Sequence, residues 1–402
     1  MLVALLGVVL RYKIVYSLPF IDQKKLLEGH SHFAFAGWIT QVLMALMINW
    51  LSEKKSEDQF RKYRWLLYGN LLTAYGMLIS FPIQGYAFFS ILFSTLSILV
   101  SYGFAIVFWK DLNSITKKTL PHRWFKIALL GNVISSIGPF SLAFMMAGRN
   151  IHQNWYLASI YFFLHFQYNI WFFFAGMGLA TQSLMTMGFA EKPLTRVFVL
   201  FALAALPTYL LSVLWWSIGI WAYMITIVAV ICQLAGWGIM ITLLKKHWNV
   251  LARSPSLLSR WLFVLAGTAL SIKLLLQAGS VIPSLSKLAF GFRPIVIGYL
   301  HLVFLGIITI FILAYLLGNG LIPDQRTTRS GLFIFVGGIV LNEGILMIQG
   351  IADIQYYNIS QANFFLFLVA CLLFSGAAII FFGQFFPIMI QITKKSTAVS
   401  DF

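Results

Sequence analysis

The sequence predicts an all-α polytopic membrane protein with about twelve transmembrane helices. Of the 402 residues, 60% are hydrophobic and only 10% are charged, whereas soluble domains are about half apolar and about a quarter charged. The apolar stretches recur at lengths near twenty residues, as needed to cross roughly 30 Å of hydrocarbon. They lack the alternating pattern of membrane β-barrel strands. These observations favour helices in a lipid bilayer.

Twelve apolar segments are predicted to cross the bilayer within a single transmembrane domain, residues 1–402. Their ranges are 1–19, 28–51, 64–84, 86–109, 124–147, 154–184, 194–216, 218–244, 257–281, 293–318, 330–350 and 363–391. The connecting loops reach only about a dozen residues. No soluble domain therefore fits between the spans, and the function is expected to lie in or at the membrane.

The basic residues predict the orientation of these spans. With the N-terminus inside, 19 Lys and Arg residues fall in inside loops and 5 in outside loops. The five outside residues are Lys24, Lys25, Arg149, Lys287 and Arg293. Because cytoplasmic loops carry the excess of basic residues, both termini are expected to be cytoplasmic. The same bias accounts for the net charge of +17, so the expected partner is the lipid bilayer and not nucleic acid.

The two cysteines and three of the seven histidines are not expected to bind a cofactor or to take part in catalysis. Cys232 and Cys371 lie in apolar runs and form no C-x-x-C motif, so neither a disulfide framework nor a c-type haem is expected. His122 and His247 are interpreted as solvated residues at cytoplasmic helix ends. His152 is interpreted in the same way, as a residue of an outside loop.

The other four histidines fall inside predicted spans, where ionisable groups are costly enough to indicate function. His30 and His32 open the second span, His165 lies in the sixth and His301 in the tenth. All three spans run from outside to inside, and His165 and His301 lie roughly 12–15 Å below the outer surface. Imidazole is a common ligand of metals and of haem iron. A shared cofactor site is therefore predicted, and interhelical hydrogen bonds are the alternative.

His30 and His32 are two residues apart, and this spacing places them on different sides of a helix. His30 and His32 are about 200° apart around a helix, so they point to different sides and are not expected to bind one metal together. Three further polar residues in the spans, Glu343, Lys273 and Gln233, indicate a different function. They would line the path of a twelve-helix secondary transporter.

Twelve spans with histidines on the second, sixth and tenth resemble subunit I of the haem-copper oxidases, a family that includes membrane nitric oxide reductases. The element His30-Ser-His-Phe-Ala-Phe-Ala-Gly-Trp38 is similar to the start of oxidase-like bacterial proteins. The chain also resembles the NnrS-type haem proteins of the nitric oxide response. The resemblance implies an oxidase-like helix bundle in the bacterial inner membrane, and it implies haem b as cofactor.

The resemblance also implies roles for single residues. His30 or His32 matches the second-helix ligand of the low-spin haem, and His301 matches the second histidine of the tenth-helix pair. Tyr299 stands where the first histidine of that pair would be. Arg293 would face outside and neutralise haem carboxylates.

Further roles follow for the sixth span and its surroundings. His165, with Tyr168 nearby, looks like the sixth-helix ligand of a copper or a second iron, and Tyr299 would be close to that metal. Arg149 is a second candidate for binding haem carboxylates. The family also has two histidines on the seventh helix, but Leu206-Pro-Thr-Tyr-Leu210 and its neighbours contain none. A complete oxygen-reducing centre is therefore not expected.

The sequence thus predicts a haem-binding membrane protein with a redox or gas-responsive role, with or without copper. If it is an enzyme, it is a haem-dependent oxidoreductase. An electron donor or other respiratory subunits would be its protein partners. Two alternatives stay open: the secondary transporter, and a structural subunit of a respiratory membrane complex.

Overall fold

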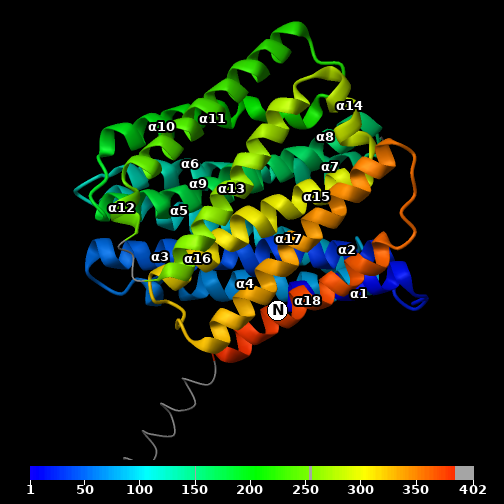
Figure 1. The fold of residues 1–402 in the computed structure, drawn as a ribbon, viewed down its shortest axis with the longest axis horizontal. Coiled ribbons are helices and arrows are strands. Elements are labelled where there is room, and N and C mark those ends of the chain that lie inside the picture. Colours follow the sequence, from blue (N-terminus) through cyan, green and yellow to red (C-terminus); the bar gives the residue numbers. More distant parts are fainter. Residues whose placement is uncertain (150, 253–255, 385–402) are drawn as a thin grey trace, which may run out of the picture. The chain divides into compact units, whose positions relative to one another are not determined.

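The computed structural model describes residues 1–149, 151–252 and 256–384, and every regular element in these ranges is a helix (Figure 1). The helices are α1 (Leu2–Val15), α2 (Gln23–His32), η1 (Phe33–Thr40), α3 (Gln41–Lys55), α4 (Phe60–Gln84), α5 (Phe88–Ser114), α6 (Leu120–Ser135), α7 (Ile137–Ala147), α8 (Gln153–Leu164), η2 (His165–Phe172), α9 (Phe173–Thr186), α10 (Glu191–Ala205), η3 (Pro207–Val213), α11 (Ile220–Lys246), α12 (Trp248–Leu251), α13 (Leu257–Ser280), α14 (Pro283–Gly291), α15 (Arg293–His301), η4 (Leu302–Thr309), α16 (Ile310–Gly318), α17 (Arg326–Ile354) and α18 (Ala362–Gly383).

Each predicted span coincides with a helix or a run of helices, although the end of the span 363–391 lies outside the described residues. Within the described ranges, nine helical runs are long and apolar enough to cross a membrane, and the bent pair α10–η3 would be a tenth. The 14 residues of α1 rise about 21 Å, short of a bilayer core. The run from Gln153 to Thr186 is long, but polar residues interrupt its apolar character. Twelve crossings stay a prediction.

Large apolar side chains on the outside of the helices fit a lipid environment. Ile83, Phe144 and Trp221 are 72%, 81% and 80% exposed, and each belongs to a helical run long and apolar enough to cross a membrane. A soluble monomer rarely exposes wide apolar surfaces. The predicted all-α polytopic membrane protein is therefore confirmed at this level, and its helices contact the bilayer.

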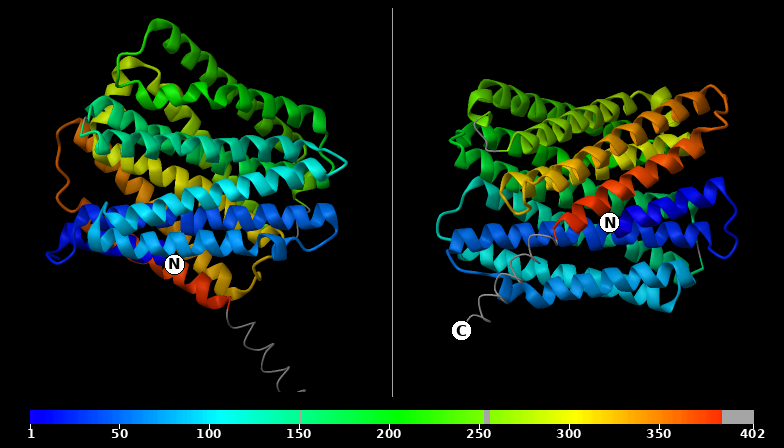
Figure 2. Two further views of the ribbon diagram at one scale, coloured as in Figure 1. Left: turned by 180° about the vertical axis from the view of Figure 1, so that it is seen from behind. Right: turned by 60° about the horizontal axis from the view of Figure 1, so that its bottom comes forward.

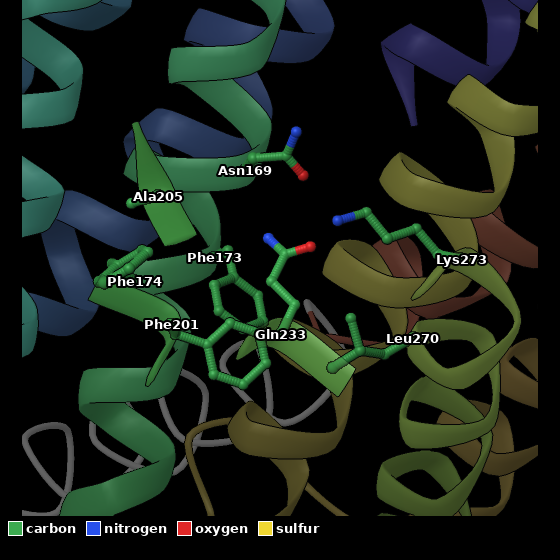
Figure 3. A pocket seen from close by; sticks show the side chains of 8 residues that line it. All are labelled: Asn169, Phe173, Phe174, Phe201, Ala205, Gln233, Leu270 and Lys273. Atoms are coloured by element: carbon green, nitrogen blue, oxygen red, sulfur yellow. The ribbon is translucent and has the colours of Figure 1, made fainter. Parts of the chain in front are cut away.

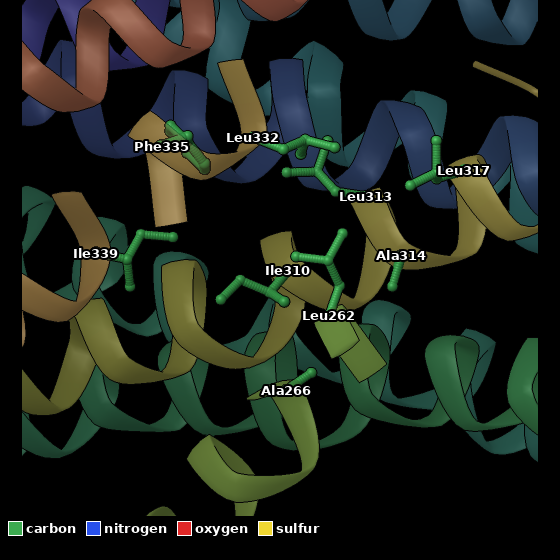
Figure 4. Close-up of a cluster of buried hydrophobic side chains, with 9 residues drawn as sticks. All are labelled: Leu262, Ala266, Ile310, Leu313, Ala314, Leu317, Leu332, Phe335 and Ile339. Carbon is green, nitrogen blue, oxygen red and sulfur yellow. The ribbon is translucent and has the colours of Figure 1, made fainter. Parts of the chain in front are cut away.

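The described residues form two compact units. The first contains the described parts of Met1–His30, Ser254–Gly267 and Phe292–Phe402. Within it α17 packs against α18, and α18 packs against α1 (Figure 1). An apolar core joins the first half of α13 to α16 and α17 (Figure 4). Its buried residues are Leu262, Ala266, Ile310, Leu313, Ala314, Leu317, Leu332, Phe335 and Ile339.

The second unit contains the described parts of Ser31–Arg253 and Thr268–Gly291. Within it α4 packs against α5, α7 against α8, and α6 against η2 and α9 (Figure 2). An ion-pair cluster joins α3, α4 and α5: the buried Asp111 carboxylate accepts hydrogen bonds from Lys55 at 2.7 Å, Lys62 at 2.6 Å and Tyr63 at 2.6 Å. Because two ammonium groups and a hydroxyl surround it, this buried carboxylate is fully paired.

Three segments of π-helix begin beside predicted site histidines. η1 directly follows His32, η2 begins at His165, and η4 directly follows His301. π-Helical segments are rare and are frequently found at functional sites. Their looser winding leaves carbonyl groups for side chains: the Ala36 carbonyl in η1 accepts a 2.9 Å hydrogen bond from Asn70. The hydrophobic pattern of the sequence does not predict these π-helical segments.

A sharp break follows α10. The axes of α10 and η3 differ by 48°, and Pro207 begins η3. Proline has no N–H to donate and its ring clashes with the preceding helical turn. The carbonyl of Ala205 next to the break is therefore available to a side chain.

The interpretation of His122 as a solvated residue is wrong. Its side chain is only 3% exposed and meets the ring of Trp50 edge-on, with 5.1 Å between centroids. Its Nδ1 atom accepts a 3.0 Å hydrogen bond from the backbone N–H of Thr119 and caps the start of α6. A histidine next to a helix start can thus be recruited as a cap, which removes it from water.

Candidate functional site

The first unit brings together two of the predicted haem ligands, His30 and His301. They come from the end of α2 and the end of α15 and lie close enough to interact electrostatically. The ring of His30 also lies against α1: a Cβ at Gly7 would be 3.7 Å from its Cε1 atom. Two helices far apart in the sequence thus carry these histidines within the first unit, and the ring of His30 lies against Gly7 of α1.

The hydrogen bonds of these two histidines leave nitrogen lone pairs available. The Nδ1 atom of His301 lies 2.8 Å from the carbonyl oxygen of Ile297. Because a carbonyl can only accept, Nδ1 carries the proton and Nε2 keeps its lone pair. The Nδ1 atom of His30 is buried and has no hydrogen-bond partner of good geometry among the described residues, and the backbone of Val3 in α1 lies near the ring. A proton on one ring nitrogen fixed by a carbonyl is the usual preparation of a metal-binding histidine.

Arg11 is the third member of this site, and the sequence analysis did not single it out. The half-buried guanidinium of Arg11, on α1, acts electrostatically on both His30 and His301. It also lies near Arg293, the first residue of α15. Two neighbouring guanidinium groups attract an anion such as a carboxylate. The available signal was a charged side chain within the predicted span 1–19, where charges are costly.

His32 belongs to a different environment. Its ring stacks on Phe81 with 4.4 Å between centroids and 7° between planes, and Nε2 lies 3.5 Å from the hydroxyl of Tyr86. Both partners are residues of the second unit. His30 and His32 thus contact different helices, as their spacing predicts.

His165 lies in the second unit and is completely buried. Its Nε2–H donates to the Ala205 carbonyl at 2.9 Å, the carbonyl beside the break after α10. Asn169 then donates its amide to Nδ1 at 3.1 Å. Both ring nitrogens are hydrogen-bonded, so a metal would have to displace one of these partners. The role of His165 as a metal ligand stays a prediction.

The remaining predicted site residues are divided between the units. Tyr168 is buried in η2, in the unit of His165, and Tyr299 lies on α15, in the unit of His301. Arg149 is exposed in the tight turn after α7, with a φ angle of 50°. It belongs to the second unit, whereas Arg293 belongs to the first. Of the two predicted anion-binding arginines, only Arg293 is thus associated with the His30–His301 pair.

The residues of the alternative transporter path are also divided. Lys273 and Gln233 line one small cavity in the second unit. Glu343 belongs to the first unit, where its carboxylate accepts a 3.0 Å hydrogen bond from the neighbouring Asn342. Lys273 and Gln233 therefore define a second polar site, separate in chemistry from the histidine pair.

The fold and these sites define a class: an all-helical, multi-pass membrane protein with two buried polar sites. Comparison with known proteins adds no family, because no model of a known protein family matches the chain and no curated protein does either. In the described ranges, no group of three or more His, Cys, Asp or Glu side chains is placed to hold a metal ion. A haem iron with two axial imidazoles requires only two such ligands.

Proposed function

We propose that this chain binds one b-type haem and serves in a redox or gas-responsive role in the bacterial inner membrane, with both termini cytoplasmic. His30 and His301 are the residues that would hold the iron of this haem. The observation that carries the proposal is that these two histidines belong to one unit, within electrostatic range of each other and of Arg11. Of the two histidines that match the second-helix haem ligand of the resembling family, His30 and His32, we propose His30.

The donor set supports a haem better than a closed metal site. His301 has a free Nε2 lone pair, and His30 has a buried Nδ1 without a hydrogen-bond partner of good geometry among the described residues. Neutral imidazoles are the form that ligates iron. A haem held by both would supply one-electron transfer, and a gas would bind only if one imidazole left the iron.

The positive charges of Arg11 and Arg293 also support a bound haem. A haem carries two carboxylates, which are costly to bring into a membrane without cationic partners. Arg11 interacts with both histidines and with Arg293, so a carboxylate held by this pair would place the macrocycle beside the imidazoles. Arg149 is not part of this proposal.

A complete oxygen-reducing or nitric-oxide-reducing centre is not proposed. Such centres in the resembling family need a second metal with several imidazoles, and residues 194–216 offer none. In this chain, Nε2 of His165 instead donates a hydrogen bond to the backbone carbonyl of Ala205. A single nitrogen ligand fixes neither the affinity nor the geometry of copper.

Optical spectra of purified protein test the proposal. After expression with haem supplied, the reduced protein is expected to show the sharp α and β bands of a six-coordinate b-type haem. His30→Ala and His301→Ala should each abolish these bands, because either change leaves the iron with one axial imidazole. His32→Ala is the matched control, two residues from His30, and should retain them.

Two results would contradict this assignment. One is a folded wild-type protein, monodisperse by size-exclusion chromatography, that contains no haem. The other is loss of the bands in His32→Ala with retention in His30→Ala. The first result would favour the transporter or the structural subunit, and the second would move the ligand to the other face of the helix.

A further inference from the structure

The second unit contains a small cavity, lined in part by polar side chains, within an apolar helix bundle (Figure 3). Its volume is about 10 Å³, which is enough for one water molecule. Three polar side chains line it: Asn169 from η2, Gln233 from α11 and Lys273 from α13. The rest of the lining is mostly phenylalanine and leucine from α9, α10 and α13.

Lys273 is a buried amine without an acidic partner. Its side chain is 6% exposed, and among the described residues no carboxylate acts on it electrostatically. The helix that carries it is fixed nearby, because Trp237 of α11 donates a 2.8 Å hydrogen bond to Ser271 of α13. The amine therefore cannot simply extend to water, as lysines near helix ends do.

The two amides of the cavity present oxygen atoms to this amine. His165 donates from Nε2 to the Ala205 carbonyl, so its Nδ1 must accept from the amide nitrogen of Asn169. That bond turns the Asn169 oxygen to the cavity, as Figure 3 shows. The Oε1 atom of Gln233 is buried and has no partner among the described residues, and Figure 3 shows it directed to the amine of Lys273.

We propose that this cavity is a proton-binding site, in which Lys273 takes up one proton from a single water-sized space and holds it between Asn169 and Gln233. The proton arrives as hydronium. The lone pair of the amine forms the new N–H bond, one O–H bond of hydronium breaks, and a neutral water molecule remains. The two amide oxygens then accept hydrogen bonds from the ammonium group or from that water.

The lining chemistry favours a proton over an anion. An anion would need N–H groups directed to it, whereas the His165–Asn169 hydrogen bond directs an oxygen atom into the cavity. An ammonium group with no carboxylate beside it is costly in a membrane interior. Two acceptor oxygens offset part of that cost, so both protonation states of the amine can be held.

Few other titratable groups face this site. From η2, His165 lies within range of the charge of Lys273, but both of its ring nitrogens are hydrogen-bonded. From η3, the ring of Tyr209 lies 5.9 Å from that of His165. The cavity residues contributed by α9, α10 and α11 are not ionisable. A proton that binds in this cavity therefore binds to Lys273.

Nuclear magnetic resonance of the full chain in lipid bilayers, labelled with ¹⁵N-lysine, tests the proposal. The Nζ resonance distinguishes an amine from an ammonium group. We expect one resonance to switch between the two forms as the pH is changed across the neutral range. It should be missing in Lys273→Met and present in Lys117→Met, which removes an exposed loop lysine.

A second variant keeps the amine and tests the site itself. Gln233→Leu removes one acceptor oxygen, so the ammonium form should give way to the amine at a lower pH than in the wild type. An unchanged midpoint would overturn the role of Gln233. The proposal as a whole is overturned if every lysine of the wild type stays an ammonium group across the range. Replacement of chloride by gluconate should leave the midpoint unchanged, and a large shift would identify an anion site.

Discussion

A carbonyl oxygen beside a histidine determines what that histidine can bind. In His301 the carbonyl of Ile297 occupies one nitrogen and leaves the other free. In His165 the carbonyl of Ala205 and the amide of Asn169 occupy both. The same side chain, next to or at the start of a π-helical segment, thus keeps a free nitrogen in one unit and is fully hydrogen-bonded in the other.

A pH-dependent ion pair outside the spans gives a prediction at this scale. The hydrogen bond from Arg329 holds the pKa of the Asp324 carboxyl below its ordinary value, and it joins the two groups at 2.6 Å. A lowered pKa in the folded state means that the pair stabilises the fold above the ordinary pKa of aspartate. This stabilisation is lost as the pH falls through the lowered value.

Asp324→Asn should therefore lower the Tm slightly at neutral pH, because Arg329 is largely exposed and such pairs contribute little. The difference from the wild type should disappear in acid. Thermal unfolding of purified protein in detergent, measured from neutral pH down to about pH 3, checks this. Asp353→Asn, an acid at the other end of α17, serves as the control. A difference that grows in acid would contradict the assignment.

At the scale of elements, glycines determine how closely helices approach. A Cβ at Gly376 of α18 would lie 2.6 Å from the backbone nitrogen of Phe335, and one at Gly331 of α17 would lie 2.9 Å from that of Ile380. Backbone cannot move aside as a flexible side chain can. The contact of α17 with α18 therefore depends on small residues, as is usual where membrane helices pack closely.

Gly376→Ala is expected to force α17 and α18 apart and to destabilise the protein by about 1–3 kcal/mol, the usual cost of overpacking. Gly337→Ala is the matched control on α17, because a Cβ there would meet no described atom within 4 Å. Thermal unfolding in detergent compares the two. Equal Tm values would show that this helix contact is looser than the structure indicates.

At the scale of the whole molecule, the charge bias predicts the topology. Reporter fusions at residue 402 and in the loop 185–193 should be cytoplasmic, and a fusion in the loop 148–153 should be outside. The physical reason is the excess of basic residues in loops that stay inside. An outside location of residue 402 would mean an odd number of crossings, for example with the short α1 lying at the surface.

The sequence analysis found the two histidines of the site but not their surroundings. His30 and His301 could be singled out because imidazoles are rare and costly in hydrocarbon. The choice between His30 and His32 could not be made, since it depends on which face of α2 meets α1 and α15. Arg11 was not recognised, although it lies in the middle of the predicted span 1–19, where a charged side chain is costly.

Hydropathy, helix spacing and loop charge together determined that the chain is a multi-pass helical membrane protein, because these are local properties that each segment has by itself. The tertiary structure alone decided which polar groups meet. It paired His30 with His301, engaged both nitrogens of His165 and directed Lys273 at two amides. Such choices depend on helix rotation and on carbonyls left free at breaks and π-helical segments. Those features arise only when helices pack against one another.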